Sequence, residues 1–338
     1  MSASAPPPAS GPPVTAVVER APGRQRALTA LGVAISLGAL AWVVVWALHQ
    51  EAPSLPDSPS QLGALVGAIV LYLAGCAARG ERWQELLVHN GAHPQRADTY
   101  GLIAVGYLGN NILPARAGDA LRVVFLAPRA RTDARTVIGT IVAERVLDLA
   151  VLVGLFVVLA YGVLDGIDVP SAGRFAFAAL IVAVVIALLA AAAFVLHRSG
   201  HLRRVMDFLR PMGAATLRLH GRHGALMLAW SALIWGLEWA AWWLTAQAVG
   251  LDLSLLDVGY LMGLATIFVL VPSGPGYVGT FDAAIIFGLH ALGHTESALS
   301  YLILLRFVIA VPITLLGLLA LGGRFGGVAK MRAVVRAS

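Results

Sequence analysis

Long apolar runs constrain the fold of this chain more than any other feature. Six of them reach about 20 residues or more, enough to cross a hydrocarbon core roughly 30 Å thick as helices. Apolar residues make up 59% of the 338 residues and charged residues 12%, about half the charged share of a soluble domain. We therefore expect an integral membrane protein. A soluble globule, a disordered chain, a nucleic-acid module and a disulfide scaffold are excluded. The expected spans are Ala27–Leu48, Gln61–Gly80, Thr136–Tyr161, Arg174–His197, Gly224–Val249 and Ala298–Leu321.

The first run could also be read as a signal peptide, because Arg20, Arg24 and Arg26 precede it. It is longer than the apolar region of a signal peptide, however, and no small-residue cleavage motif follows it. We therefore expect a retained helix. Residues 1–26, rich in Ala, Ser, Pro and Gly, are expected to form a disordered cytoplasmic tail.

Two further apolar stretches, Thr99–Ala127 and Val258–Leu292, are interrupted by proline and glycine. Each arm is too short to cross a bilayer, and these residues stop a helix and let the backbone turn. A broken backbone is tolerated at this depth only within protein or beside a wet cavity. The expected fold is therefore an all-α polytopic membrane protein of about six full transmembrane helices plus two re-entrant helical hairpins. The residues expected to break the hairpins are Pro114, Gly118, Pro272, Gly274, Pro275 and Gly276.

Positive charges indicate the orientation, since cytoplasmic loops carry an excess of Lys and Arg. With a cytoplasmic N-terminus, every basic residue outside the apolar cores except Arg174 falls on the cytoplasmic side. Arg79, Arg82 and Arg96 are counted on the cytoplasmic side on this scheme. The asymmetry holds only if both broken stretches return to the side they entered, and it places both termini in the cytoplasm.

The two breaks resemble each other, and both read apolar-Pro-small-x-x-Gly. Each is preceded at a similar distance by a charged residue in a span, Arg79 or Glu238, and followed by a span with a buried arginine, Arg145 or Arg306. A unit of span, hairpin and span entering from opposite sides is the inverted repeat of many transporters. A chance similarity between two short Pro-Gly breaks is the alternative.

Charged residues inside apolar segments are the candidate site, because each costs at least about 2.5–3.5 kcal/mol at the centre of a span. Glu144 and Asp148 share a helix face, and Arg145 can pair with Asp148. These three form either an ion-pair lattice that holds helices together or part of a binding site. The predicted substrate-binding residues are Asn110, Arg116, Asp119, Arg122, Glu144, Arg145, Asp148, Glu238, Asp282 and Arg306.

Two members of this set have more specific expectations. Arg116 at a hairpin tip is suited to hold phosphate, because guanidinium matches it bidentately and a half-helix N-terminus follows. Alternatively, Arg116 simply reaches the headgroup level. Glu238 has no charged neighbour on its own helix, so we expect Arg306 or a backbone N–H at a hairpin end as its partner.

Several functions lack their sequence signals. There is no G-x-x-x-x-G-K-[ST] motif, so no ATP motor is expected. The nine histidines are scattered and Cys76 is the single cysteine, so we expect no metal and no cofactor. No nucleophile–base pair is visible, and we do not expect an enzyme.

With these residues in view, the sequence resembles the lysylphosphatidylglycerol synthase/flippase transmembrane-domain family, from about residue 27 to 321. The resemblance lies in Arg79–Trp83, Asn110–Asp119 with Arg122, Glu144–Asp148 and Pro272–Gly279. It implies a flippase-like transmembrane domain over residues 27–322, followed by a basic cytoplasmic tail over 323–338. The aminoacyl-transfer domain of the full-length proteins is missing. Tyr277 also replaces a glycine of the family's second motif, and Asp282 stands near the position of its glutamate.

The resemblance implies movement of phospholipids, including aminoacylated ones, between leaflets. We therefore predict a lipid translocase of the bacterial inner membrane whose partners are membrane lipids and not nucleic acid. The alternatives are a secondary transporter of a small polar solute and a non-transporting membrane partner of an envelope-synthesis enzyme. A homo-oligomer is compatible with each of these.

Overall fold

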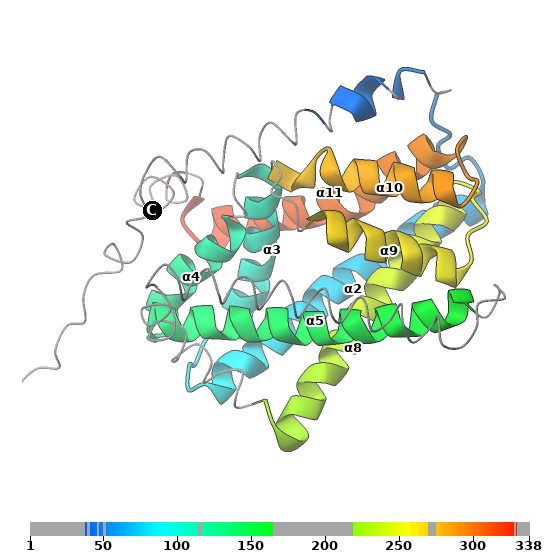
Figure 1. Cartoon of the computed structure of the whole chain (residues 1–338). Helices are drawn as coiled ribbons and strands as arrows, with labels where there is room; N and C mark the ends of the chain where they lie inside the picture. The colour runs from blue at the N-terminus through cyan, green and yellow to red at the C-terminus, as the bar shows by residue number, and fades with distance from the viewer. Residues whose placement is uncertain are drawn as a thin grey trace, which may run out of the picture.

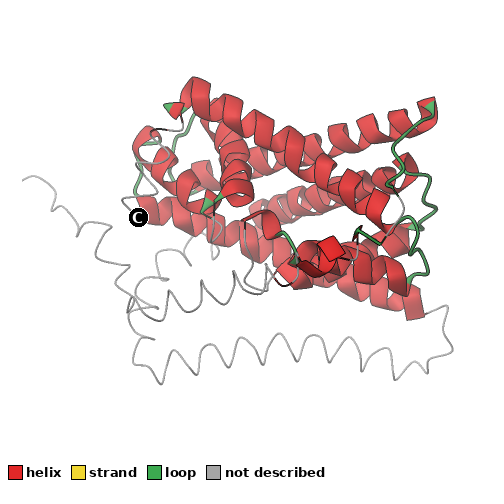
Figure 2. Ribbon diagram, turned by 90° about the horizontal axis from the view of Figure 1, so that it is seen from above, coloured by secondary structure: helices red, strands yellow, loops and turns green. Residues whose placement is uncertain are grey.

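The computed structural model describes residues 52–113, 117–164, 219–269 and 275–327, with a few positions between 38 and 49 and residue 329. Throughout these ranges the regular structure is helical, with no strand (Figures 1 and 2). The helices are α2 (Pro59–His89), α3 (Arg96–Ile112), α4 (Gly118–Arg129), α5 (Ala134–Leu164), α8 (Gly221–Ala248), α9 (Leu255–Val269), the 3₁₀ turn η3 (Pro275–Tyr277), α10 (Thr280–Ala291) and α11 (Ala298–Arg324).

Helices α2, α8 and α11 are long and apolar enough to cross a membrane, judged by length and composition. They coincide with three of the expected spans, and the 31-residue α5 coincides with a fourth. The expected span Arg174–His197 lies outside the described residues, as does most of Ala27–Leu48. The structure therefore has the character of a helical membrane protein, as predicted.

Helix α2 begins at a well-formed cap and ends later than predicted. Ser58 and Gln61 form a reciprocal capping box, and Pro59 occupies the first turn, where its missing N–H costs nothing. The helix then continues past Gly80 to His89. Arg79 and Arg82 therefore lie within a packed helix, and the Arg82 side chain is only 1% exposed. The helix therefore outlasts the predicted span, because the buried apolar surface of α2 continues beyond its uninterrupted apolar run. The side of the membrane on which the two arginines lie stays a prediction.

The structure describes a helix on either side of each predicted break: α3 ends at Ile112 and α4 begins at Gly118, whereas α9 ends at Val269 and α10 begins at Thr280, after the 3₁₀ turn η3. Helix α3 packs against α4, and α9 packs against α10. In the second break, Gly276, Tyr277 and Gly279 have φ angles of 63°, 56° and 92°, a left-handed region that glycine enters at little cost. Of the six predicted break residues, Pro114, Pro272 and Gly274 lie outside the described residues.

Tight packing joins the elements into one body. Helices α2 and α8 share the most extensive contact, and α3 packs closely against α11. At the end of α11, Arg324 contacts Asp98 of α3 (Nε to Oδ1, 2.6 Å) and Phe325 is fully buried near Phe125. Figure 1 shows α5 running across these helices and α3 with α4 at one end.

Candidate functional site

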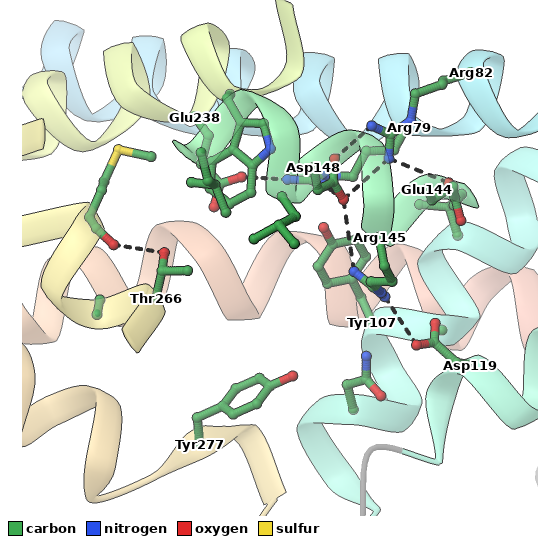
Figure 3. A pocket seen from close by; sticks show the side chains of 18 of the residues that line it. Arg79, Arg82, Tyr107, Asp119, Glu144, Arg145, Asp148, Glu238, Thr266 and Tyr277 are labelled. Carbon is green, nitrogen blue, oxygen red and sulfur yellow. Dashed lines mark hydrogen bonds and ion pairs between the residues drawn. The ribbon is translucent and has the colours of Figure 1, made fainter. Parts of the chain in front are cut away.

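A cavity of about 540 Å³ lies between α2, α3, α4, α5, α8, α9 and the second break. Its lining mixes charged, aromatic and aliphatic side chains, and Figure 3 shows several of the charged residues gathered around Asp148 and Arg145. The charged and polar lining consists of Arg79, Arg82, Asn110, Asp119, Arg122, Glu144, Arg145, Asp148, Glu238 and Thr266, and the aromatic lining of Tyr107, Trp235, Trp242, Tyr277 and Phe281.

Three arginines and three carboxylates of the cavity lining alternate in a closed ring. Arg82 contacts Asp148 at 2.6 Å and Glu144 at 3.6 Å, and Glu144 contacts Arg122 at 2.6 Å. Arg122 then contacts Asp119 at 3.2 Å. Arg145 closes the ring, 3.0 Å from Asp119 and 3.9 Å from Asp148. We call these six residues, which come from α2, α4 and α5, the charge ring.

Arg79 and Glu238 form a branch on the charge ring. Arg79 Nη2 donates to Glu238 Oε2 at 2.6 Å, and its Nη1 lies 3.8 Å from Asp148. The guanidinium also sits over the Trp235 ring, 5.5 Å from its centre. The partner of Glu238 is therefore Arg79 rather than the expected Arg306. The ring and the branch together hold four positive and four negative charges, so they can neutralise one another.

The members of this network differ sharply in their exposure. Side chains of Arg82, Glu144, Arg122 and Asp148 are at most 8% exposed. They have further partners as well: Arg82 donates to Ser231, and Arg122 stacks over Trp83 at 4.0 Å. By contrast, Arg145 is 58% exposed and Asp119 34%. The inner groups therefore join helices, although the buried Nε atoms of Arg82 and Arg122 have no hydrogen-bond partner among the described residues. Arg145 and Asp119, which are more exposed, can reach a ligand.

Seven of the ten predicted binding residues line this one cavity: Asn110, Asp119, Arg122, Glu144, Arg145, Asp148 and Glu238. Arg116 lies outside the described residues. Asp282 and Arg306 are not among the lining residues. They pair with each other at 2.6 Å, and Arg306 also donates to the carbonyls of Gly276 (2.6 Å) and Tyr277 (3.2 Å). These two residues stabilise the second break.

Asparagines at the end of α3 connect the two breaks. The Asn110 side-chain oxygen accepts a hydrogen bond from Gly118 N across the first break, at 3.1 Å. Asn111 donates to Thr314 of α11 at 2.8 Å. Gly276 of the second break packs so closely on Asn111 that an added Cβ would lie 3.5 Å from its carbonyl oxygen. The two breaks therefore meet beside the cavity.

Sequence reasoning missed Arg79 and Arg82 as site residues. Their signal was the i, i+3 spacing, which places both on one face of α2. It also missed that Trp235 and Trp242 flank Glu238 on the cavity face of α8. Two further tryptophans of α8, Trp239 and Trp243, donate to the carbonyls of Leu255 and Leu253.

Comparison with known proteins identifies related sequences. A 139-residue segment is 30% identical to "Glycosyltransferase AglD" of Haloferax volcanii, covering 41% of this chain and 22% of that protein. A 216-residue segment is 27% identical to a "UPF0104 membrane protein" of Methanothermobacter thermautotrophicus, covering 55% of this chain and 63% of that protein. The chain thus spans less than two thirds of either relative. Residues 29–317 match the family model described as "Lysylphosphatidylglycerol synthase TM region". The chain belongs to this lysylphosphatidylglycerol synthase transmembrane-region family.

Proposed function

We propose that this chain moves a phosphate-bearing membrane lipid between the leaflets of the bacterial inner membrane, with no ATP motor and no covalent chemistry of its own. Membership of a family named for a membrane lipid synthase supports a lipid-related role. The long apolar helices support a multi-pass protein in the membrane. Both termini are cytoplasmic in this proposal.

The proposed architecture is an inverted repeat with two re-entrant hairpins. Helix lengths support it, because α2, α3, α4 and α5 have 31, 17, 12 and 31 residues, and α8, α9, α10 and α11 have 28, 15, 12 and 27. In each half, a broken pair of short helices lies between two long ones. Such repeats place the substrate near the middle of the membrane, beside the broken helices.

The observation that carries the proposal is the exposed Arg145 at the cavity edge of an otherwise buried charge ring. A guanidinium binds phosphate with two parallel hydrogen bonds, and Arg145 has the one strongly exposed side chain among the four arginines of the network. The aromatic and aliphatic residues that share the cavity lining suit the apolar part of a lipid. Arg122 is a weaker candidate, because Glu144, Asp119 and Trp83 already surround it.

Lipid movement in proteoliposomes tests this proposal. Lipids labelled with a fluorophore on one acyl chain are quenched by dithionite from outside, and quenching beyond the outer leaflet reports translocation. We expect wild-type protein to accelerate this phase and Arg145→Ala to slow it about tenfold or more. The other ion pairs of the charge ring should remain after the substitution, because Asp119 keeps Arg122 as its partner and Asp148 keeps Arg82.

Arg96→Ala is the matched control. Arg96 is 69% exposed and pairs only with Glu81, away from the cavity, so its loss should leave lipid movement unchanged. Wild-type protein that fails to accelerate quenching of anionic, zwitterionic and cationic lipids alike would refute the translocase.

One comparison supports a second candidate function. The relative from Haloferax volcanii is named a glycosyltransferase, and this chain matches 22% of it. In this second proposal, the chain serves an envelope glycosyltransferase as a non-transporting membrane partner. Stable co-purification with such an enzyme, together with no lipid movement by the isolated chain, would favour this function. A shift in melting temperature with a water-soluble substrate would instead indicate a solute transporter.

A further inference from the structure

The second break carries an ion pair that mirrors one in the cavity. Asp119 lies in the first turn of α4 and pairs with Arg145 of the long helix that follows. Asp282 lies in the first turn of α10 and pairs with Arg306 of the long helix that follows it. Both pairs therefore join the arm after a break to the next long helix, with the acid and the base on the same elements.

The two pairs are in different states. Arg145 is 58% exposed, lines the cavity, and has Asp119 as its one close carboxylate. Arg306 is 22% exposed and contacts Asp282, two carbonyl oxygens of the second break and the face of Phe281. One arginine is thus free to receive an anion, whereas the donors of the other are occupied by the protein.

Equivalent groups in unlike states are what an inverted repeat produces when it alternates between two conformations. We propose that Asp282–Arg306 is a second phosphate-binding site, equivalent to Asp119–Arg145, that opens toward the opposite leaflet as the observed cavity closes. A lipid phosphate then passes from Arg145 to Arg306. The inverted repeat and the identity of this ligand rest on the proposed function, but the exchange of open and closed pairs can be measured without transport.

The contact between the two breaks connects the Asp282–Arg306 pair to the Asp119–Arg145 pair. Gly276, whose carbonyl accepts from Arg306, packs on Asn111 at the end of α3. The neighbouring Asn110 holds Gly118, the residue before Asp119. Release of Arg306 from Gly276 would therefore act on a segment that contacts the end of α3, next to the residue that supports the first pair. We therefore expect the opening of the two sites to be coupled.

Thiol labelling of two equivalent positions tests this inference. Leu149 lies one turn after Arg145 and lines the cavity, and Ala310 lies one turn after Arg306 on α11. Each is replaced by cysteine in a Cys76→Ser background and exposed to a membrane-impermeant thiol reagent in vesicles of known orientation. We expect Leu149→Cys to react from one side of the membrane and Ala310→Cys from the other.

Substitutions in the two pairs should then shift the labelling in opposite directions. Asp282→Asn should speed labelling at position 310 and slow it at position 149, each by at least about fivefold, the lower end for coupled sites. Asp119→Asn should do the reverse, and Asp282→Glu should restore the wild-type pattern. In detergent, added phosphatidylglycerol should protect position 310 in the Asp282→Asn protein.

Several results of these experiments would contradict the proposal. Labelling of both positions from the same side would overturn the proposal, as would faster labelling at 310 without slower labelling at 149. Absence of protection by phosphatidylglycerol would overturn the phosphate site. Reciprocal labelling in a protein that moves no lipid would instead refute the translocase and retain the paired sites. If Asp282→Asn does not fold, the Asp119→Asn variant still tests the exchange.

Discussion

Glu144 shows how much a single side chain in the charge ring matters. It is almost fully buried and lies 2.6 Å from Arg122 and 3.6 Å from Arg82. Removing one partner from a buried ion pair costs about 3–5 kcal/mol, because a charge is left without compensation. We therefore expect Glu144→Ala to lower the melting temperature in detergent strongly.

Glu238→Ala is the comparison for this prediction. Its side chain is 20% exposed, and its partner Arg79 keeps Asp148 at 3.8 Å. The melting temperature should therefore fall much less than with Glu144→Ala. Equal losses of stability would show that burial within the ring does not set the cost.

At the scale of elements, the approach of α3 to α11 depends on missing side chains. A Cβ at Gly317 would lie 2.5 Å from the Ala104 carbonyl oxygen and 2.8 Å from the Leu108 Cβ. Because neither neighbour is the end of a flexible side chain, the helices must separate. Gly317→Ala should destabilise the protein by about 1–3 kcal/mol, the usual cost of overpacking.

Gly322 on the same helix is a matched control, since an added Cβ there meets nothing within 4 Å. Gly322→Ala should leave the melting temperature unchanged or raise it, because alanine favours helix over glycine. A similar fall in melting temperature for both variants would contradict the role given to this close contact.

At the scale of the whole molecule, α2 and α8 join the two halves of the chain. The Arg79–Glu238 bond crosses this contact, within reach of Asp148 on α5. In a double-mutant cycle of unfolding free energies, Arg79→Ala and Glu238→Ala should be non-additive by about 0.5–3 kcal/mol. Arg79→Ala and Asp98→Ala should add within about 0.5 kcal/mol, because Asp98 pairs with Arg324 and Arg129 instead. Additivity of the first pair would show that this bond does not couple the halves.

Hydrophobicity alone predicted much of this architecture. The spans matching α2, α5, α8 and α11 and the two interruptions could be read from the sequence, because helix length and proline–glycine breaks are local properties. Which charges meet could not be read. Glu238 pairs with Arg79, far away in sequence, and only the packing of α2 on α8 brings them together.

The C-terminal end of α2 could not be predicted from the sequence either, and part of the site was missed for this reason. The apolar run of α2 stops at Gly80, but the helix continues for two further turns, with Trp83, Leu86 and Leu87 fully buried. Arg82 was therefore left out of the predicted site, although it lies in the charge ring. A positive-charge rule applied to loops has no means of detecting an arginine on the buried face of a continuing helix.

The closed charge ring also limits which substitutions this sequence can accept during evolution. Each member touches two neighbours, so replacing one leaves two groups of unbalanced charge in a setting with little water. A change at Arg82 is tolerable only when Asp148 or Glu144 changes with it. Descendants of this chain should therefore keep the other five ring residues as a block or lose them in matched sets. Arg145 is the exception, because its side chain is 58% exposed, and a substitution there can change ligand preference at the lowest structural cost.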